Sequence, residues 1–286
     1  MSLLTTITLT RYSEPDWLLF ETLESLAMQQ NIQADILMLD QKSSTETAQK
    51  CVSLTNKDIN FRYIEIPAKS LSFARNEAIR LTKTNCLLYI DTDAIAAPDW
   101  ASNLVRVLQQ DGVGIAGGKI VPKWHKHPSF IQKSQTILDQ YSMLDLGEGE
   151  TDVHRVVGAN FGINMQRLGK AAEFDQNLGR REGKLYSGEE SKLCADATAL
   201  GLKVRYVGAA LVQHQVLPER IKFSWIATRM YYQGLSSAKR GGPPSPSNKG
   251  KYTFWDFLAL GLLAPFYLYG FVKGKRLQKS NVGVNS

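Results

Sequence analysis

The sequence predicts an α/β protein with a mostly parallel central sheet and helices on both faces. Two observations favour this class. Strand-like and helix-like segments alternate from Leu3 onward, and the strand-like segments are continuous apolar runs. Composition agrees, since 43% hydrophobic and 21% charged residues over 286 positions describe a globular chain with a sizeable core. These values exclude a disordered chain, a collagen-like chain and a polytopic membrane protein.

The first part of the chain is predicted to form four strands, each followed by a helix. The strands are expected over residues 3–10, 35–40, 61–66 and 86–91. Helices are expected to begin at Pro15, Ser43, Ser72 and Pro98, because proline favours a first turn and Ser43 with Glu46 has capping-box spacing. Residues 112–117 match G-x-G-x-x-G but follow a helix, so Gly112 is interpreted as the helix end and the rest as a strand.

The pattern loosens over residues 122–155, where His125 and His127 are interpreted as loop residues. Regular structure is expected to resume at Val156, with a last strand ending at His214 and a helix over 221–240. We therefore expect a catalytic domain over 1–240, a Gly/Pro/Ser linker over 241–252, and an apolar, aromatic segment with a basic tail over 253–286.

An apolar strand delivers two carboxylates, Asp91 and Asp93, to the loop that follows it. Ligands of open α/β sheets bind beyond the carboxyl ends of the strands. Hard divalent cations prefer oxygen ligands, so the pair is a candidate site for a cation that neutralises a phosphate. Taken alone, the same spacing is also compatible with two solvated acids at a turn.

Two further groups could take part in chemistry. Glu189 and Glu190 follow Gly188 and precede an apolar helix, where a carboxylate could act as a general base for an incoming hydroxyl. Acids are also favoured in any first helical turn, because they offset the helix dipole. His214 could supply an imidazole to a metal, and a structural histidine is the alternative.

The order of these motifs resembles glycosyltransferase family 2, an inverting, nucleotide-sugar-dependent family with the A-type glycosyltransferase fold. The resemblance covers residues 4–241. Its segments are, in chain order, 10–14 (the nucleotide-binding turn), 39–44 (V-D-N-x-S-x-D), 72–76 (A-R-N), 91–93 (D-x-D), 157–161 (G-A-N), 174–175 with 188–190 (F-D and G-E-D) and 212–214 (a late histidine).

The resemblance implies a reaction and a role for each matching position. A nucleoside-diphosphate sugar, with UDP-sugar preferred, would be the donor, and Mn²⁺ or Mg²⁺ the cofactor. A glycan or lipid-linked acceptor of polysaccharide or glycolipid biosynthesis of the bacterial type would supply the hydroxyl. The implied donor-binding residues are Thr10, Arg11, Glu14, Asp40, Arg75, Asp91 and Thr92. The implied metal ligands are Asp93 and His214, the acceptor-binding residues Gly158, Ala159 and Asn160, and the base Glu190 or Glu189.

Two departures from the family pattern matter. Glu190 stands where the family has the aspartate of G-E-D, which brings Glu189 into contention as the base. The Q-x-x-R-W of processive synthases is missing, which favours addition of a single sugar. A metal-dependent nucleotidyltransferase and a non-catalytic sugar-nucleotide-binding relative are the alternatives, although the former would typically need a Gly-rich basic loop after the first strand.

Residues 239–286 carry the whole net charge of +7, since they contain eight basic residues and one acid, Asp256. This location favours a membrane surface over nucleic acid as the partner. Residues 254–272 are apolar and rich in aromatics but contain Pro265, so we expect peripheral membrane contact through 253–279, with helices packed on the domain as the alternative. Three dispersed cysteines and a start unlike a signal peptide predict a cytoplasmic protein at the inner membrane face.

Overall fold

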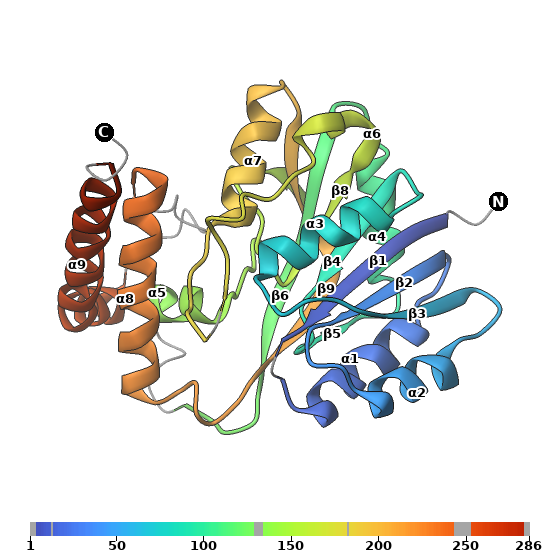
Figure 1. Ribbon diagram of the computed structural model, residues 1–286, viewed down its shortest axis with the longest axis horizontal. Helices are drawn as coiled ribbons and strands as arrows, with labels where there is room; N and C mark the ends of the chain where they lie inside the picture. The colour runs from blue at the N-terminus through green and yellow to red at the C-terminus, as the bar shows by residue number, and fades with distance from the viewer. Residues whose placement is uncertain (1–3, 13, 129–133, 182, 243–252, 283–286) are drawn as a thin grey trace.

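The computed structural model describes residues 4–12, 14–128, 134–181, 183–242 and 253–282, so most of the expected linker lies outside the described residues. The described residues form a nine-stranded sheet in the order β3-β2-β1-β4-β8-β6-β9-β5, with β7 pairing on β9 (Figure 1). The strands are β1 (Leu4–Arg11), β2 (Gln33–Asp40), β3 (Ile59–Glu65), β4 (Cys86–Ile90), β5 (Ala94–Ala96), β6 (Val113–Trp124), β7 (Glu150–Asp152), β8 (Asn160–Asn164) and β9 (Lys203–Val216).

The expected mostly parallel sheet is confirmed. Strands β3, β2, β1 and β4 are parallel neighbours, and β6 is parallel to β9. β8 runs antiparallel between β4 and β6, and the short strands β5 and β7 run antiparallel to β9. Because β1, β2 and β4 run the same way, their carboxyl ends meet at one edge of the sheet, where Arg11, Asp40 and Asp91 follow one another.

Helices cover both faces of the sheet. One core contains side chains of α1, α2 and α4, and the other contains side chains of α3 and α7. The helices are α1 (Asp16–Ala27), α2 (Thr45–Leu54), α3 (Leu71–Leu81), α4 (Trp100–Leu108), α5 (Gln135–Leu138), α6 (Met165–Leu168), α7 (Glu189–Ala199), α8 (Phe223–Arg240) and α9 (Phe254–Val282).

The helix starts follow from local chemistry with small corrections. The Ser44 hydroxyl, not that of Ser43, accepts a hydrogen bond from the Thr47 amide, and Ser43 instead adopts a positive φ of 58°. The Ser70 hydroxyl caps α3 one residue before that helix begins. α4 ends at a cap on Gln109, and Gly112 supplies the φ of 75° for the turn into β6.

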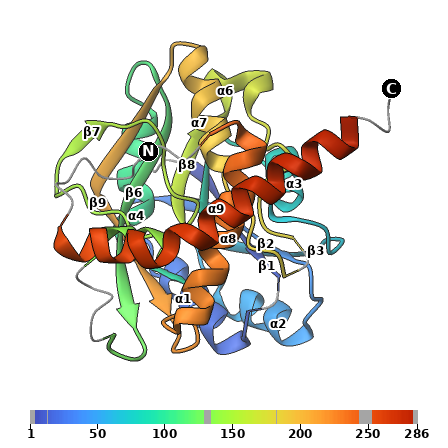
Figure 2. The same cartoon turned by 90° about the vertical axis from the view of Figure 1, so that its left-hand side faces the viewer.

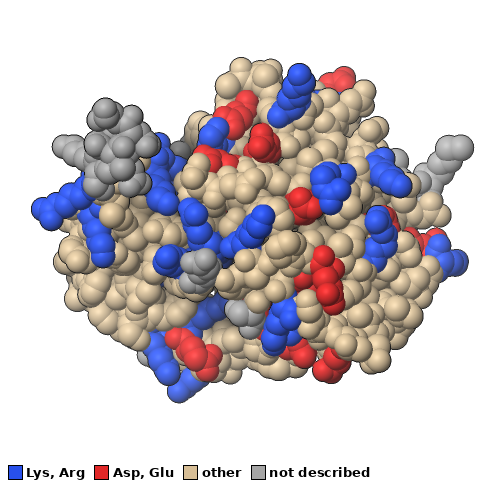
Figure 3. All heavy atoms as spheres, in the orientation of Figure 1, with Lys and Arg blue, Asp and Glu red and all other residues tan. Residues whose placement is uncertain are grey.

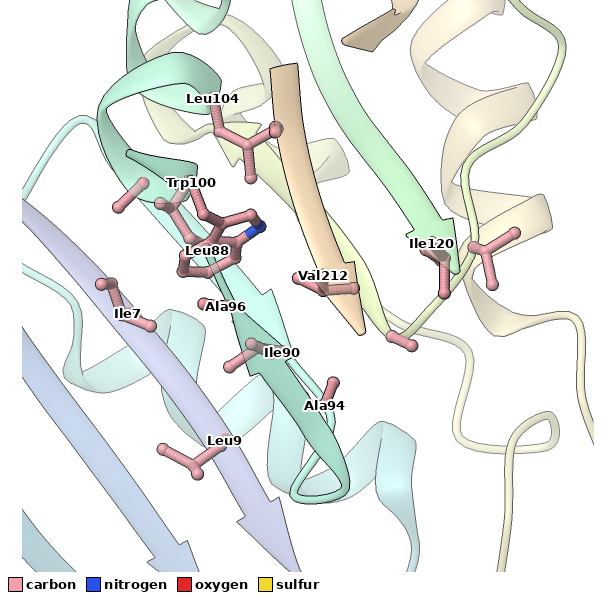
Figure 4. Close-up of a cluster of buried hydrophobic side chains, with 14 of the residues drawn as sticks. Ile7, Leu9, Leu88, Ile90, Ala94, Ala96, Trp100, Leu104, Ile120 and Val212 are labelled. Carbon is pink, nitrogen blue, oxygen red and sulfur yellow. The ribbon is translucent and has the colours of Figure 1, made fainter. Parts of the chain in front are cut away.

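The larger core lies between the sheet and helices α1 and α4. Figure 4 shows Ile7 and Leu9 from β1, Leu88 and Ile90 from β4, and Trp100 from α4 converging there. The Trp100 indole is fully buried and donates to the Asn160 amide oxygen at 2.7 Å. This packing makes the end of β4 rigid, which positions the acidic loop that follows it.

Helix α9 packs against α8 and crosses it at an angle (Figure 2), with small residues where the two helices meet. A Cβ on Gly234 of α8 would overlap the Tyr267 carbonyl of α9, and one on Gly270 would overlap the Tyr231 carbonyl of α8. Gly274 would bring a Cβ within 2.6 Å of the Ala238 methyl. Such glycines allow two helix backbones to approach closely, so α9 is a built part of the fold.

The start of α9 is anchored by one buried acid. The Asp256 carboxylate is 1% exposed and accepts bonds from the Ser134 hydroxyl, the Thr136 amide, and the amide and hydroxyl of Thr253. Burial alone would raise the pKa of Asp256, but these donors outweigh it and lower the pKa to about 2. Asp256, the acid within the apolar segment, thus links the start of α9 to α5 by hydrogen bonds.

Candidate active site

Strand pairing brings the predicted acidic motif and the late histidine together. Asp91 and Asp93 follow β4, and β5 pairs with β9 so that Ala94 lies opposite His214. The His214 Nε2 atom is consequently 3.1 Å from Asp93 Oδ1. One candidate ligand atom from each of Asp91, Asp93 and His214 lies within 4.8 Å of the others.

This group has the chemistry of a divalent cation site. Two carboxylates and one imidazole suit Mn²⁺, and carboxylates with water suit Mg²⁺. The Nδ1 atom of His214 is buried with no hydrogen-bond partner among the described residues. The Nε2 atom faces Asp93, and the ring still has an unfilled nitrogen; with two carboxylates nearby, this donor set matches the implied metal.

The two acids of the motif have different electrostatic surroundings. Burial and then the charge of Asp93 raise the pKa of Asp91, although Arg75 acts in the opposite direction. Burial would also raise the pKa of Asp93, but His214 and Arg220 outweigh it and hold that pKa below its ordinary value. Arg220 donates to Asp93 Oδ2 at 2.8 Å. The surroundings of Asp93 therefore favour its ionised form more than those of Asp91.

A cleft of about 200 Å³ opens beside the acidic motif. Of the predicted residues, Thr10, Glu14, Asp91, Thr92 and Asp93 line it. Sequence reasoning missed its basic wall. That wall comes from the segment before α7 and from the end of β9, and consists of Arg180, Arg181, Lys184 and Arg220. Two sequence features could have indicated this wall: the Arg180-Arg181 pair before G-E-E, and an arginine six residues after His214. Neither pattern is specific for a phosphate-binding site.

Two predicted donor residues lie behind the cleft wall. Arg11 is fully buried, donates to Asp16 and to the Thr47 hydroxyl, and approaches Asp40 within 3.8 Å. Asp40 is also fully buried and accepts bonds from the Tyr63 hydroxyl and the Lys42 amide. Their charges compensate each other beneath the turn that follows β1.

Arg75 forms a buried link between the motifs. Its guanidinium donates to Glu189 Oε1 at 2.7 Å and to the Gly158 carbonyl at 3.0 Å, and lies 3.8 Å from Asp91 Oδ1. The guanidinium carbon lies over three rings, 5.3 Å from Phe161, 5.5 Å from Phe174 and 5.8 Å from Tyr89. One side chain thus connects the A-R-N, D-x-D, G-A-N and G-E-E segments.

The two glutamates at the start of α7 differ in their partners. Glu189 is 4% exposed and forms the ion pair with Arg75, whereas Glu190 is half-buried. Burial and then the charge of Glu190 raise the pKa of Glu189 to about 7, against the effect of Arg75. The Oε2 atoms of both glutamates have no hydrogen-bond partner among the described residues. Glu190 is therefore the more accessible acid.

The side chains of Ala159 and Asn160 in the G-A-N segment are buried within the fold. Asn160 is fully buried, and its amide group donates to the Lys119 and Ala210 carbonyls and accepts from Trp100. Ala159 is 1% exposed. A Cβ on Gly158 would lie 2.8 Å from Arg75 Nη2, which explains the glycine. The structure therefore places the Asn160 side chain within the sheet and not on an open surface.

Comparisons with known proteins agree with this geometry. The family model described as glycosyl transferase family 2 matches residues 7–168. A glucosyl-dolichyl phosphate glucuronosyltransferase of Haloferax volcanii is 28% identical over 171 residues, which cover 59% of this chain and 55% of the relative. The chain thus spans about half the length of that curated relative.

Two solved structures share the fold. One is the mannosyltransferase PcManGT from Pyrobaculum calidifontis in complex with GDP-Man and Mn²⁺, with a TM-score of 0.61 and 16% identity over 99% of this chain and 76% of that one. The other is GalNAc-T7 with UDP, GalNAc and Mn²⁺, with a TM-score of 0.58 and 14% identity over 85% of this chain and 52% of that one. The fold is that of A-type glycosyltransferases, and the chain belongs to glycosyl transferase family 2.

Proposed function

We propose that the protein transfers a single sugar, with inversion, from a nucleoside-diphosphate sugar to an acceptor hydroxyl. The observation that carries this proposal is that one candidate metal ligand, Asp91, and one of the two glutamates, Glu189, contact the same arginine side chain. A cation-type group at the cleft and a carboxylate pair are joined through the single guanidinium of Arg75. The neighbours in complex with GDP-Man or UDP and with Mn²⁺ support the donor class and the metal. We retain UDP-sugar as the first donor to test.

Donor binding would use the cleft and its basic wall. Thr10, Glu14 and Thr92 line the cleft, and Arg180 and Arg220 would meet the diphosphate from the opposite side. Guanidinium groups pair well with phosphate oxygens. In this proposal Arg11, Asp40 and Arg75, which are buried, position the nucleotide-binding segments beneath the donor.

Asp91, Asp93 and His214 would hold the divalent cation. When bound, that cation neutralises charge on the diphosphate leaving group. Arg220, which already contacts Asp93, adds positive charge on the same side. We propose Mn²⁺ over Mg²⁺ because one of the three ligands is an imidazole.

Glu190 would take the acceptor proton, because Glu189 is occupied by Arg75. In the single displacement, the acceptor oxygen forms a bond to the anomeric carbon as the bond from that carbon to the diphosphate oxygen breaks. The proton passes to the carboxylate, and the nucleoside diphosphate leaves with the electron pair. Inversion follows because nucleophile and leaving group occupy opposite faces of the sugar. We propose that the backbone at Gly158 and Ala159 borders the acceptor.

We further propose peripheral membrane contact through residues 253–279 at the cytoplasmic face. Within the described part of the chain, Phe254–Gln278 is a helix long and apolar enough to cross a membrane, and 22% of its most apolar window is buried. Its exposed side chains include Phe254, Phe257, Leu262 and Leu268, each more than half exposed. Lys273 and Lys275 follow, where they could meet anionic lipid. Three buried, free cysteines agree with a reducing compartment.

Release of nucleoside diphosphate tests the proposed function. The protein is screened with UDP-, GDP- and dTDP-sugars, with Mn²⁺, with Mg²⁺ and with chelator, and bound donors are identified by thermal shift. We expect one nucleotide class to raise the melting temperature and to be cleaved only with metal. Full cleavage in excess chelator would contradict the metal role, and stabilisation by no sugar nucleotide would contradict the donor class. Binding to vesicles with and without anionic lipid tests the membrane contact.

A further inference from the structure

Three arginines beside the carboxylate pair leave most of their donors unfilled. Arg229 donates one hydrogen bond, to the Leu185 carbonyl at 2.9 Å, and Arg240 donates one, to the Ser237 hydroxyl at 3.4 Å. Within the described ranges, the Arg180 guanidinium has no hydrogen-bond acceptor, and none of the three has a carboxylate within 4.0 Å. A guanidinium carries five N–H donors. These groups therefore have spare capacity for an anion.

Two other arginines have more complete sets of partners. Arg167 donates to four backbone carbonyls, those of Leu108, Gln109, Gln110 and Val113. Arg75 donates to Glu189 and to the Gly158 carbonyl and lies 3.8 Å from Asp91. The Nε atom of Arg229 is buried with no hydrogen-bond partner among the described residues, as is that of Arg11. Arg11, however, has two carboxylate partners, whereas Arg229 and Arg240 have none within 4.0 Å in the described part of the chain, so their unfilled donors point to a ligand.

Arg229 and Arg240 reach the site from helix α8. The segment before α7 is docked on that helix, since the Ser187 amide donates to the Ser236 hydroxyl and the Ser187 hydroxyl donates to Gln233. A Cβ on Gly188 would overlap the Arg240 guanidinium, so this group lies directly on the first residue before Glu189 and Glu190. The two α8 arginines thus contact the segment that leads into Glu189 and Glu190.

Positive charge accumulates at this position. Burial and then the charge of Arg180 lower the pKa of Arg229 to about 10; Glu190 and Glu189 act in the opposite direction, and Arg240 lowers it further. Burial likewise lowers the pKa of Arg240, against the charge of Glu190, and Arg155 acts in the same direction as burial. Figure 3 shows basic side chains gathered over the α8–α9 half of this face. Mutual repulsion of this kind is relieved when an anion binds between the guanidinium groups.

We propose that Arg229 and Arg240 bind a phosphate group of the acceptor, next to the hydroxyl that Glu190 deprotonates. The proposal rests on the proposed function and names the acceptor class for the same site. The phosphate is recognised and is not the nucleophile: the acceptor hydroxyl oxygen bonds to the anomeric carbon, its proton passes to Glu190, and the nucleoside diphosphate leaves. Arg180 lines the cleft and serves the donor instead.

A phosphate could belong to a soluble sugar phosphate or to a lipid headgroup, and the shared chemistry is the phosphate. Direct binding distinguishes the sources without any turnover. Octyl phosphate, inorganic phosphate and octyl β-glucoside are titrated into the full chain and into variants by calorimetry. The variants are Arg229→Gln, Arg240→Gln, Arg240→Lys and, as a charge-matched control, Lys203→Gln, which removes an exposed lysine at the opposite end of β9.

We expect the wild type to bind octyl phosphate at least tenfold more tightly than octyl β-glucoside. Arg229→Gln and Arg240→Gln should each weaken that binding about 10- to 100-fold, the range for a charged hydrogen bond. Arg240→Lys should restore part of it, and Lys203→Gln should match the wild type. Equal affinities for octyl phosphate and inorganic phosphate would indicate a soluble phosphate acceptor. A lower affinity for inorganic phosphate would indicate a lipid acceptor. Either outcome supports the proposal.

Two results would overturn the proposal: equal affinity for the phosphate and glucoside probes, or wild-type phosphate affinity in both glutamine variants. Because these readouts need neither donor nor metal, they are independent of the nucleotide-release assay. Retained phosphate binding without sugar-nucleotide cleavage would defeat the proposed function alone. Metal-dependent transfer without a phosphate preference would defeat the acceptor assignment alone.

Discussion

Replacing Arg75 by Met should destabilise the protein strongly, and the loss should depend on pH. The substitution keeps much of the side-chain length but removes the charge that faces Glu189 at 2.7 Å in a site where both side chains are at most 5% exposed. Removing one partner of a buried ion pair typically costs about 3–5 kcal/mol, because the other charge stays buried without compensation. The Gly158 carbonyl also loses its donor.

The pH dependence follows from Glu189. Its pKa in the folded protein is about 7, above the ordinary value of 4.5, and Arg75 acts to lower it. Without Arg75 the folded-state pKa rises further, so Glu189 is neutral at pH 5 and charged only in alkaline solution. A raised acid pKa means that the native state holds more protons than the unfolded state, and stability therefore falls as pH rises. The destabilisation should be small at pH 5 and largest near pH 9.

Urea unfolding of the wild type, Arg75→Met and Arg75→Met/Glu189→Gln at pH 5 and pH 9 measures this effect. The double variant removes both charges and should recover much of the free energy of unfolding lost in the single variant at pH 9. A loss below about 1 kcal/mol at pH 9, equal losses at the two pH values, or no recovery in the double variant would refute the reasoning.

Three further outcomes are expected. Asp93→Asn should weaken Mn²⁺ binding by about 100-fold or more and abolish nucleotide release, as measured by calorimetry and a coupled assay; unchanged metal affinity would exclude Asp93 as a ligand. Gly270→Ala, whose methyl would overlap the Tyr231 carbonyl, should lower the free energy of unfolding by about 1–3 kcal/mol, whereas Gly261→Ala on the same helix has open space and should raise it by about 0.5–1 kcal/mol. Wild-type stability should fall by up to about 3 kcal/mol from pH 4.5 to pH 7 through Glu189, and Glu189→Gln should flatten that slope.

The α/β alternation was predictable because it depends on local patterns. Continuous apolar runs identified β1, β2, β3 and β4, and a capping hydroxyl or proline marked the helix starts to within about two residues. Strand direction was not predictable for β8, because its apolar run is the same whether it lies parallel or antiparallel to β4. That choice depends on pairing between distant segments.

The site was predictable where a motif ends a strand and not where it depends on tertiary contacts. Asp91, Asp93 and His214 meet as expected, through a three-residue strand that no pattern indicated. The internal bonds of Asn160 join β8 to β6 and β9, and only the folded sheet reveals them. The unfilled donors of Arg229 are likewise a property of its surroundings in space.

The turnover of Glu190→Gln tests the central claim most directly. With the donor found by the screen and saturating Mn²⁺, the account predicts that kcat for nucleoside-diphosphate release falls by about 10²–10⁴, while the affinity for the donor stays close to that of the wild type. Glu189→Gln, which leaves Glu190 in place, should retain more activity than Glu190→Gln. A wild-type kcat in Glu190→Gln, or a larger loss in Glu189→Gln, would contradict the assignment of Glu190 as the base.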